Sequence, residues 1–264
     1  MNERADMFDG ETSPMRPIFA SSSKMNFTPS QTHSYLGKLL PLIADVHDRE
    51  VTVLPSFTSL PVAQEMLKQT GITWGGQDVH PEDMGAHTGE TSARMLADLG
   101  CTYAMVGHAE RRRDHAETND LIGLKAAAAL RWGVRPILCV GELTRQSMGR
   151  AMDDIRAQLE PIGGANLDGV VIAYEPLWAI GSGSSADPSW VESIHSSIHE
   201  WLRTNGANST GHVARVAYGG SVTPAAAPEL LSTPGVDGLF VGSASLDPLA
   251  FAKIVRMPLT VGER

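Results

Sequence analysis

The sequence predicts a single α/β domain folded as a closed (β/α)₈ barrel. Short β-prone runs alternate with longer helix-like segments, and eight such units can be traced along the chain. No low-complexity linker or block of charge divides these units. The length of 264 residues suits one barrel. A doubly wound open sheet is the structural alternative, but at this length it would normally need fewer strands or an extra domain.

The strands are expected where short apolar runs end in small or polar residues. In chain order they are Pro17–Ser21, Glu50–Leu54, Thr73–Gln77, Thr102–Val106, Arg135–Val140, Val170–Tyr174, Val213–Tyr218 and Gly238–Val241. The helices are expected in the longer segments between these runs. They are Pro29–Asp48, Leu60–Gln69, Ser92–Leu99, Asp120–Trp132, Gln146–Leu159, Pro188–Asn205 and Ala225–Leu231.

Residues 1–15 form an acidic, polar extension ahead of the first expected strand. They lack the basic start and the apolar core of a signal peptide. We therefore expect a short mobile extension followed by a barrel domain over residues 16–264. No run of the sequence approaches the length of a membrane span.

The composition narrows the classes of function. A net charge of −9 argues against a general role in binding nucleic acid or a membrane surface. Any anionic substrate must therefore be held by local groups, because the field of the whole protein would repel it. Cys101 and Cys139 show no metal-ligand spacing, so we expect reduced thiols, a cytoplasmic protein and no metal site.

The most informative motif begins with the continuous apolar run Val170–Tyr174, which predicts a buried parallel strand. Glu175 follows directly, so its carboxylate should emerge at the carboxyl end of the strand, where α/β enzymes place their chemistry. The small residues of Gly181–Gly183 suit a loop that moves over the site. A lone Glu-Pro pair after a strand more often just starts a loop, so the other strand ends must decide.

Two further strand ends carry candidate functional side chains. Lys24 follows the first strand, and a charge in a crowded barrel mouth needs a partner or an anionic ligand. His108 follows the fourth strand behind Gly107, and Glu110 favours a helix start close behind it. Taken singly, such a lysine or histidine is more often a solvated or structural residue.

Glycine-serine loops follow the last two strands, at Gly219–Val222 and Gly242–Ala244. Small residues there let backbone N–H groups approach a ligand closely, and barrel enzymes commonly bind phosphate at this place. One such loop is usually only a turn. Two of them on adjacent strands, together with Gly181–Gly183, favour a phosphate site.

With these residues in place, the chain resembles the triosephosphate isomerase family, whose fold is the TIM barrel. The resemblance runs from about Pro17 to Ala252 in the order of the family's motifs. The matching motifs are Lys24-Met25-Asn26, Gly75-Gly76-Gln77, Gly85-Ala86-His87-Thr88-Gly89-Glu90, Gly107-His108-Ala109-Glu110-Arg111-Arg112, Cys139-Val140-Gly141-Glu142, Ala173-Tyr174-Glu175-Pro176-Leu177-Trp178-Ala179-Ile180-Gly181, Tyr218-Gly219-Gly220-Ser221-Val222 and Asp237-Gly238-Leu239-Phe240-Val241-Gly242.

The resemblance implies a role for each of the three candidate side chains. Glu175 would move a proton between the two carbons of an enediol(ate), and His108 would polarise the substrate carbonyl. Lys24 would balance the charge of the phosphate and of the developing oxyanion. Residues 176–183 would close as a lid, a behaviour for which this family is the standard example.

The resemblance also implies residues that support the substrate and the assembly. The substrate and its phosphate would be held by Ser22, Gly181, Ser221, Gly242 and Ser243, supported by Glu110 and Gly220. In a homodimer, Thr88 would reach across the interface toward the active site of the other subunit. The resemblance calls for no metal and no organic cofactor. The partners expected are therefore a small phosphorylated sugar and a second copy of the chain, with neither nucleic acid nor membrane.

Several positions depart from the family's usual pattern and leave alternatives open. Ser22 stands where most members have asparagine, Ser23 replaces an aromatic residue, and Ser243 replaces a glycine. Further departures are Asp78, His87, Ala109 and Ser184. A serine ahead of the lysine resembles a branch that isomerises tetrulose phosphates such as L-erythrulose 1-phosphate. We favour a triose phosphate as substrate, and a non-catalytic barrel with a decayed site is the third reading.

Overall fold

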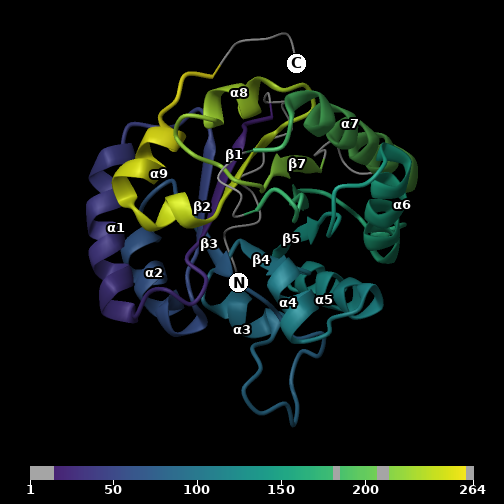
Figure 1. Cartoon of the computed structure of the whole chain (residues 1–264). Helices are drawn as coiled ribbons and strands as arrows, with labels where there is room; N and C mark the ends of the chain where they lie inside the picture. The colour runs from purple at the N-terminus through teal and green to yellow at the C-terminus, as the bar shows by residue number, and fades with distance from the viewer. Residues whose placement is uncertain (1–14, 181–184, 207–213, 260–264) are drawn as a thin grey trace.

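The computed structural model describes residues 15–180, 185–206 and 214–259 of the chain. Eight parallel strands close into a barrel in the order β1 to β8, and helices surround it (Figure 1). Closure occurs where β1 pairs with β8, with Ile18 opposite Gly238. The structure therefore confirms the predicted (β/α)₈ barrel. The predicted extension covers residues 1–15. All of it except Met15 lies outside the described residues.

The strands are β1 Ile18–Ser22, β2 Glu50–Leu54, β3 Thr73–Gly76, β4 Tyr103–Val106, β5 Arg135–Val140, β6 Val171–Tyr174, β7 Arg215–Tyr218 and β8 Gly238–Val241. The α-helices are α1 Pro29–Ile43, α2 Leu60–Leu67, α3 Ala93–Asp98, α4 Ala109–Asp114, α5 Asn119–Arg131, α6 Met148–Leu159, α7 Pro188–Asn205, α8 Ala227–Ser232 and α9 Pro248–Val255. Short 3₁₀ segments are η1 Phe57–Ser59, η2 Glu160–Ile162 and η3 Ser243–Leu246.

The expected elements agree closely with these bounds, with two differences. The first helix begins at Pro29 as expected, behind a capping box formed by Thr28 and Gln31, but it ends at Ile43 rather than Asp48. A turn closed by Val46 N–H on Ile43 C=O replaces the last helical turn and returns the chain to β2. Helix α9 was not expected. Its start carries a clear signal, Asp247 capping a helix that begins with proline.

Side chains alternate between the inside and the outside of the barrel, as the pleat of a strand requires. The inner set forms one buried cluster, and the outer set packs beneath the helices. On β6, Val171 and Ala173 point inward, so Glu175 two residues later continues on the inner side. The same alternation on β1 carries Ile18 and Ala20 inward ahead of Ser22.

Three hydrogen-bonded polar side chains fill the barrel at the amino ends of its strands. The hydroxyl of Tyr103 donates a hydrogen bond to Glu50 Oε1 at 2.8 Å and accepts one from Arg215 Nη2 at 2.7 Å. Arg215 also pairs with Glu50 at 2.7 Å. Tyr103 and Arg215 are buried, so this end of the barrel is a packed plug rather than an opening.

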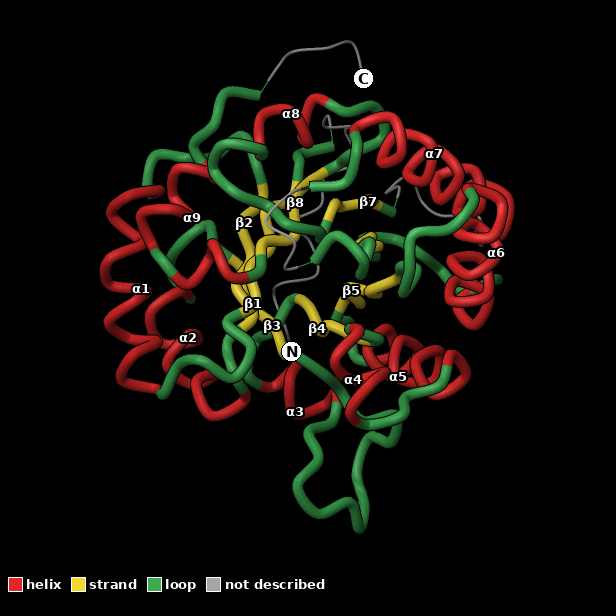
Figure 2. The backbone as a smooth tube through the Cα atoms, in the orientation of Figure 1, coloured by secondary structure: helices red, strands yellow, loops and turns green. Residues whose placement is uncertain are grey.

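One connection leaves the body of the molecule. Residues 77–92, between β3 and α3, project beyond the helices (Figure 2). The tip is exposed, and the Met84 side chain is 72% accessible to solvent. The base of this projecting loop is tied down by Asp78, which accepts hydrogen bonds from buried Lys125 and pairs with Arg111 of α4.

Closure of the barrel at Gly238 yields a prediction about stability. A Cβ atom on this residue would lie 2.1 Å from the Ile18 carbonyl oxygen, so Gly238→Ala must push β1 and β8 apart. We expect a loss of at least about 2 kcal/mol in the free energy of unfolding by urea titration. Gly149→Ala in α6 is the matched control, because its Cβ would meet nothing within 4 Å. That variant should gain up to about 1 kcal/mol. Equal effects at the two sites would contradict the prediction.

Candidate active site

A cavity of 530 Å³ opens at the carboxyl ends of the strands, and we call it the mouth cavity. It is lined by Ser22, Lys24, His108, Glu175, Ile180, Gly219, Gly220, Ser221, Val222, Thr223, Phe240, Gly242, Ser243 and Ala244. The structure thus brings together eight of the residues expected from the sequence: Ser22, Lys24, His108, Glu175, Gly220, Ser221, Gly242 and Ser243. Gly181 lies outside the described residues, and Thr88 lies on the projecting loop.

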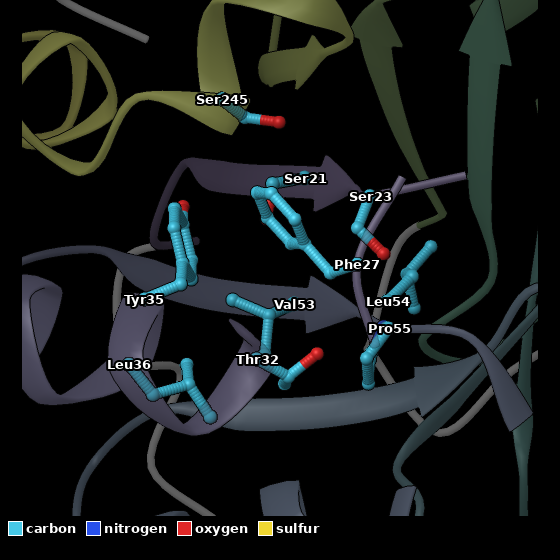
Figure 3. Close-up of a pocket in the computed structure, with 10 residues that line it drawn as sticks. All are labelled: Ser21, Ser23, Phe27, Thr32, Tyr35, Leu36, Val53, Leu54, Pro55 and Ser245. Atoms are coloured by element: carbon cyan, nitrogen blue, oxygen red, sulfur yellow. The ribbon is translucent and has the colours of Figure 1, made fainter. Parts of the chain in front are cut away.

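A second cavity lies between α1 and the outer side of β1 and β2 (Figure 3). Ser23 and Phe27 line it, and the hydroxyl of Tyr35 is buried nearby without a hydrogen-bond partner among the described residues. Its volume is 20 Å³, room for about one water molecule. A sugar phosphate does not fit there. The mouth cavity is the candidate active site because it gathers eight of the residues expected from the sequence.

Lys24 is held in an unusual backbone conformation. Its φ of 47° lies in the left-handed region, which costs a non-glycine residue about 1 kcal/mol or more. Hydrogen bonds hold it there, because Lys24 N–H donates to Ser22 Oγ and Gln77 Nε2 donates to Lys24 C=O at 3.0 Å. The ammonium group pairs with Glu110 Oε1 at 2.7 Å, so Glu110 supports the lysine as expected.

His108 caps the start of α4. Its Nδ1 accepts a hydrogen bond from Glu110 N–H at 3.2 Å, which leaves Nε2 as the protonated nitrogen of the neutral ring. Burial, followed by the nearby Lys24 charge, lowers the pKa of His108 to about 4. The imidazole is therefore neutral at pH 7 and presents an N–H donor to the cavity.

Glu175 faces His108 across the cavity floor. His108 Nε2 lies 3.6 Å from Glu175 Oε1, and both residues are only 5% exposed. Burial raises the pKa of Glu175 to about 8, partly opposed by Lys24. Two glycines make room for this residue. A Cβ at Gly219 would lie 2.8 Å from the side-chain Cγ of Glu175, and one at Gly141 would lie 1.9 Å from the Glu175 backbone carbonyl oxygen.

Two supporting residues were not assigned roles from the sequence. Gln77 ties the loop of Lys24 to β2 by donating to Leu54 C=O at 2.9 Å. Glu142 accepts hydrogen bonds from Tyr174 and Trp178 beside the Glu175 segment. Gln77 and Glu142 both follow a strand end, and that position was the available signal. Ser221, expected at the phosphate, also donates its hydroxyl hydrogen to Ala179 C=O at 2.8 Å.

The part of the chain that the structure describes contains no group of three or more His, Cys, Asp and Glu side chains arranged to hold a metal ion. None of the helices within it is long and apolar enough to cross a membrane. What the mouth cavity does assemble is a carboxyl group, a neutral imidazole and an ammonium group. On a closed parallel barrel, this is the architecture of acid–base enzymes of the (β/α)₈ class.

Comparisons with known proteins identify the family. The sequence profile of the family described as triosephosphate isomerase matches residues 17–258. Triosephosphate isomerases of Thermus thermophilus and Aquifex aeolicus are 43% and 42% identical over 247 and 245 residues, covering 92% and 91% of this chain and 98% and 99% of theirs. The crystal structure of triosephosphate isomerase from Bartonella henselae superposes with a TM-score of 0.81 at 33% identity, covering 90% of this chain and 97% of that one. The chain belongs to the triosephosphate isomerase family, which confirms the resemblance drawn from the motifs.

Burial of Glu175 makes stability depend on pH. Its folded-state pKa of about 8 lies above its ordinary value of 4.5, so the folded protein keeps a proton that the unfolded chain has released. This contribution is complete below about pH 4.5 and is lost as the pH rises toward about 8. Glu175→Gln cannot ionise, so we expect its advantage over the wild type to grow to roughly 3–5 kcal/mol at pH 8. Urea titrations at several pH values test this, and an advantage that does not change with pH would contradict it.

Proposed function

We propose that this protein interconverts dihydroxyacetone phosphate and D-glyceraldehyde 3-phosphate. The observation that carries the proposal is the buried pair of Glu175 and His108, 3.6 Å apart in one cavity with Lys24 alongside. The similarity to named triosephosphate isomerases over nearly the whole chain supports the same substrate. We further propose that the enzyme works without a cofactor, since these three side chains can carry the proton transfers. We also propose that it is cytoplasmic.

The proposed reaction moves one proton between neighbouring carbons. The Glu175 carboxylate removes a proton from the carbon next to the carbonyl, while His108 Nε2–H donates a hydrogen bond to the carbonyl oxygen. The electron pair of the C–H bond forms the enediol(ate) double bond. The carbonyl π pair moves onto its oxygen, and His108 transfers the proton of the neighbouring hydroxyl to that oxygen. Glu175 then returns its proton to the former carbonyl carbon, and the new carbonyl forms at the carbon that was first deprotonated. With a pKa of about 8, most Glu175 carboxyl groups of the substrate-free protein are protonated at pH 7, and the ionised fraction that carries out the abstraction is a stronger base than an exposed carboxylate.

The negative phosphate is proposed to bind at the far side of the mouth cavity. Gly220, Ser221, Gly242 and Ser243 line the cavity, and we propose that their backbone N–H groups bind the phosphate while Lys24 supplies a positive charge. These groups act locally, which a protein of net charge −9 needs if it is to hold an anion. The proposed lid, residues 176–183, belongs to the same proposal, and its residues 181–183, Gly181 among them, lie outside the described residues.

Purified protein assayed on two sugar phosphates tests the substrate. We expect kcat/KM for glyceraldehyde 3-phosphate to exceed that for L-erythrulose 1-phosphate by more than about a hundredfold, or roughly 2.7 kcal/mol. The role of Glu175 is tested separately: Glu175→Gln should lower turnover by roughly 10²–10⁴-fold, because the base is removed while the shape is kept.

In the assay on the two sugar phosphates, a preference for the tetrulose phosphate would shift the assignment to that substrate, a result that Ser22 on the cavity wall makes worth testing. Binding of phosphoglycolate with no turnover of either sugar would mean a decayed site.

The projecting loop is proposed to form the interface of a homodimer. Its tip carries Thr88 and the largely exposed Met84, an apolar side chain that docking would remove from water. In this proposal Thr88 reaches toward Lys24 and His108 of the partner subunit. The buried contacts of Asp78 with Lys125 and Arg111 hold the base of the loop rigid.

Analytical ultracentrifugation tests this interface. The wild type should sediment with about twice the chain mass of 28.2 kDa. Thr88→Arg places a long cation at the proposed contact, so we expect it to shift the protein toward monomer and to lower kcat. Ser193→Arg, at an exposed position on α7, is the control and should stay dimeric. A monomeric wild type, or a Thr88→Arg variant that remains a full dimer, would refute the proposed interface.

A further inference from the structure

Three side chains from separate parts of the chain meet beside the segment that follows Glu175. Trp178 comes from that segment, Trp190 from α7, and Arg145 from the connection between β5 and α6. The two indole rings stand nearly perpendicular, at 86°, with centroids 6.1 Å apart. The guanidinium carbon of Arg145 lies 5.0 Å from the Trp178 centroid and 6.0 Å from the Trp190 centroid. Perpendicular rings that share one cation form a favourable cation–π arrangement.

Hydrogen bonds connect the same two tryptophans from beneath. Trp178 Nε1 donates to Glu142 Oε1 at 2.7 Å, and the Tyr174 hydroxyl donates to the same oxygen at 3.0 Å. Trp190 Nε1 in turn donates to the Tyr174 hydroxyl at 2.9 Å. Glu142 and Tyr174 are buried, so the network has a rigid base. Trp178 is therefore held by a hydrogen bond to Glu142 and by its ring contacts with Trp190 and Arg145.

The position of Trp178 is transmitted to the mouth cavity by a tight turn. Leu177 N–H donates to Glu142 C=O, and Ile180 N–H donates to Leu177 C=O. The Ala179 carbonyl between them accepts the hydroxyl hydrogen of Ser221. The turn covers residues 177–180 and follows Glu175 by one residue, Pro176. Glu175 and Ile180 both line the mouth cavity.

We propose that Trp190 and Arg145 are positioning residues for the isomerisation, which hold Trp178 and thereby the turn that sets Glu175 and Ile180 in the mouth cavity. The inference rests on the proposed function. Neither residue lines the cavity, so each acts through Trp178. Arg145 is exposed and Trp190 is half-buried. Their loss should therefore disturb the geometry of the turn far more than the stability of the barrel.

Steady-state kinetics on glyceraldehyde 3-phosphate tests the role. We expect Arg145→Met and Trp190→Leu each to lower kcat by about 3–10-fold with KM within about twofold of wild type. Arg145→Lys should recover most of kcat, because an ammonium group also binds an indole face. The two substitutions combined should cost less than the product of their separate effects, since they support the same ring. Arg203→Ala, which breaks a surface pair with Glu200 on the same helix, is the control and should match wild type.

A second readout does not depend on turnover. The protein contains five tryptophans, so 5-fluorotryptophan labelling should give a ¹⁹F NMR spectrum simple enough to assign Trp178 through Trp178→Phe. In substrate-free protein, Arg145→Met and Trp190→Leu should shift or broaden the Trp178 resonance, whereas Arg203→Ala should not. An unmoved resonance, or kcat within 1.5-fold of wild type in both variants, would overturn the inference. If the wild type turns over no sugar phosphate, the proposed function fails, and the spectrum alone still tests whether the two residues hold Trp178.

Discussion

Withdrawal of one carboxyl group from water is the constraint on which this site depends. Glu175 lies at the end of β6 with 5% of its surface exposed. A side chain larger than glycine would collide with the Glu175 side chain at position 219 and with its backbone carbonyl at position 141. Desolvation makes the carboxylate costly and hence basic, and it also raises the pKa of the neighbouring Cys139 thiol. The surrounding barrel must therefore be rigid enough to keep the group dry. Its parallel strands, each hydrogen-bonded on both sides, provide that rigidity.

The same burial acts in opposite directions on the two groups that face each other. It raises the pKa of Glu175 and lowers the pKa of His108, because the charged form of one is an anion and of the other a cation. The result is a strong base opposite a neutral hydrogen-bond donor. The positive charge of Lys24 lowers the pKa values of both groups. The ion pair with Glu110 keeps that charge near His108 and Glu175. Environment, more than residue type, therefore distinguishes the roles of these groups.

The barrel and the three central side chains could be predicted from the sequence because each depends on local order. A short, largely apolar run gives the strand, and the polar residues just after it lie at the mouth, as Glu175, His108 and Lys24 all do. Contacts that cross the fold could not be predicted in this way. Gln77 reaches Leu54 on another strand, and Arg145 meets Trp190 only because the connection between β5 and α6 lies beside the start of α7. The early end of α1 was also missed, because a turn closed by one backbone hydrogen bond leaves no clear mark in composition.

The plug formed by Tyr103, Glu50 and Arg215 has a kinetic consequence. Among the described residues the barrel is filled at that end, so a molecule reaches Glu175 and leaves it through the mouth cavity. Departure of one occupant must then precede arrival of the next, and reactant and product exclude each other by simple occupancy. The rates of binding and release through the mouth cavity therefore limit the overall turnover rate, and a faster proton transfer alone would not raise that limit.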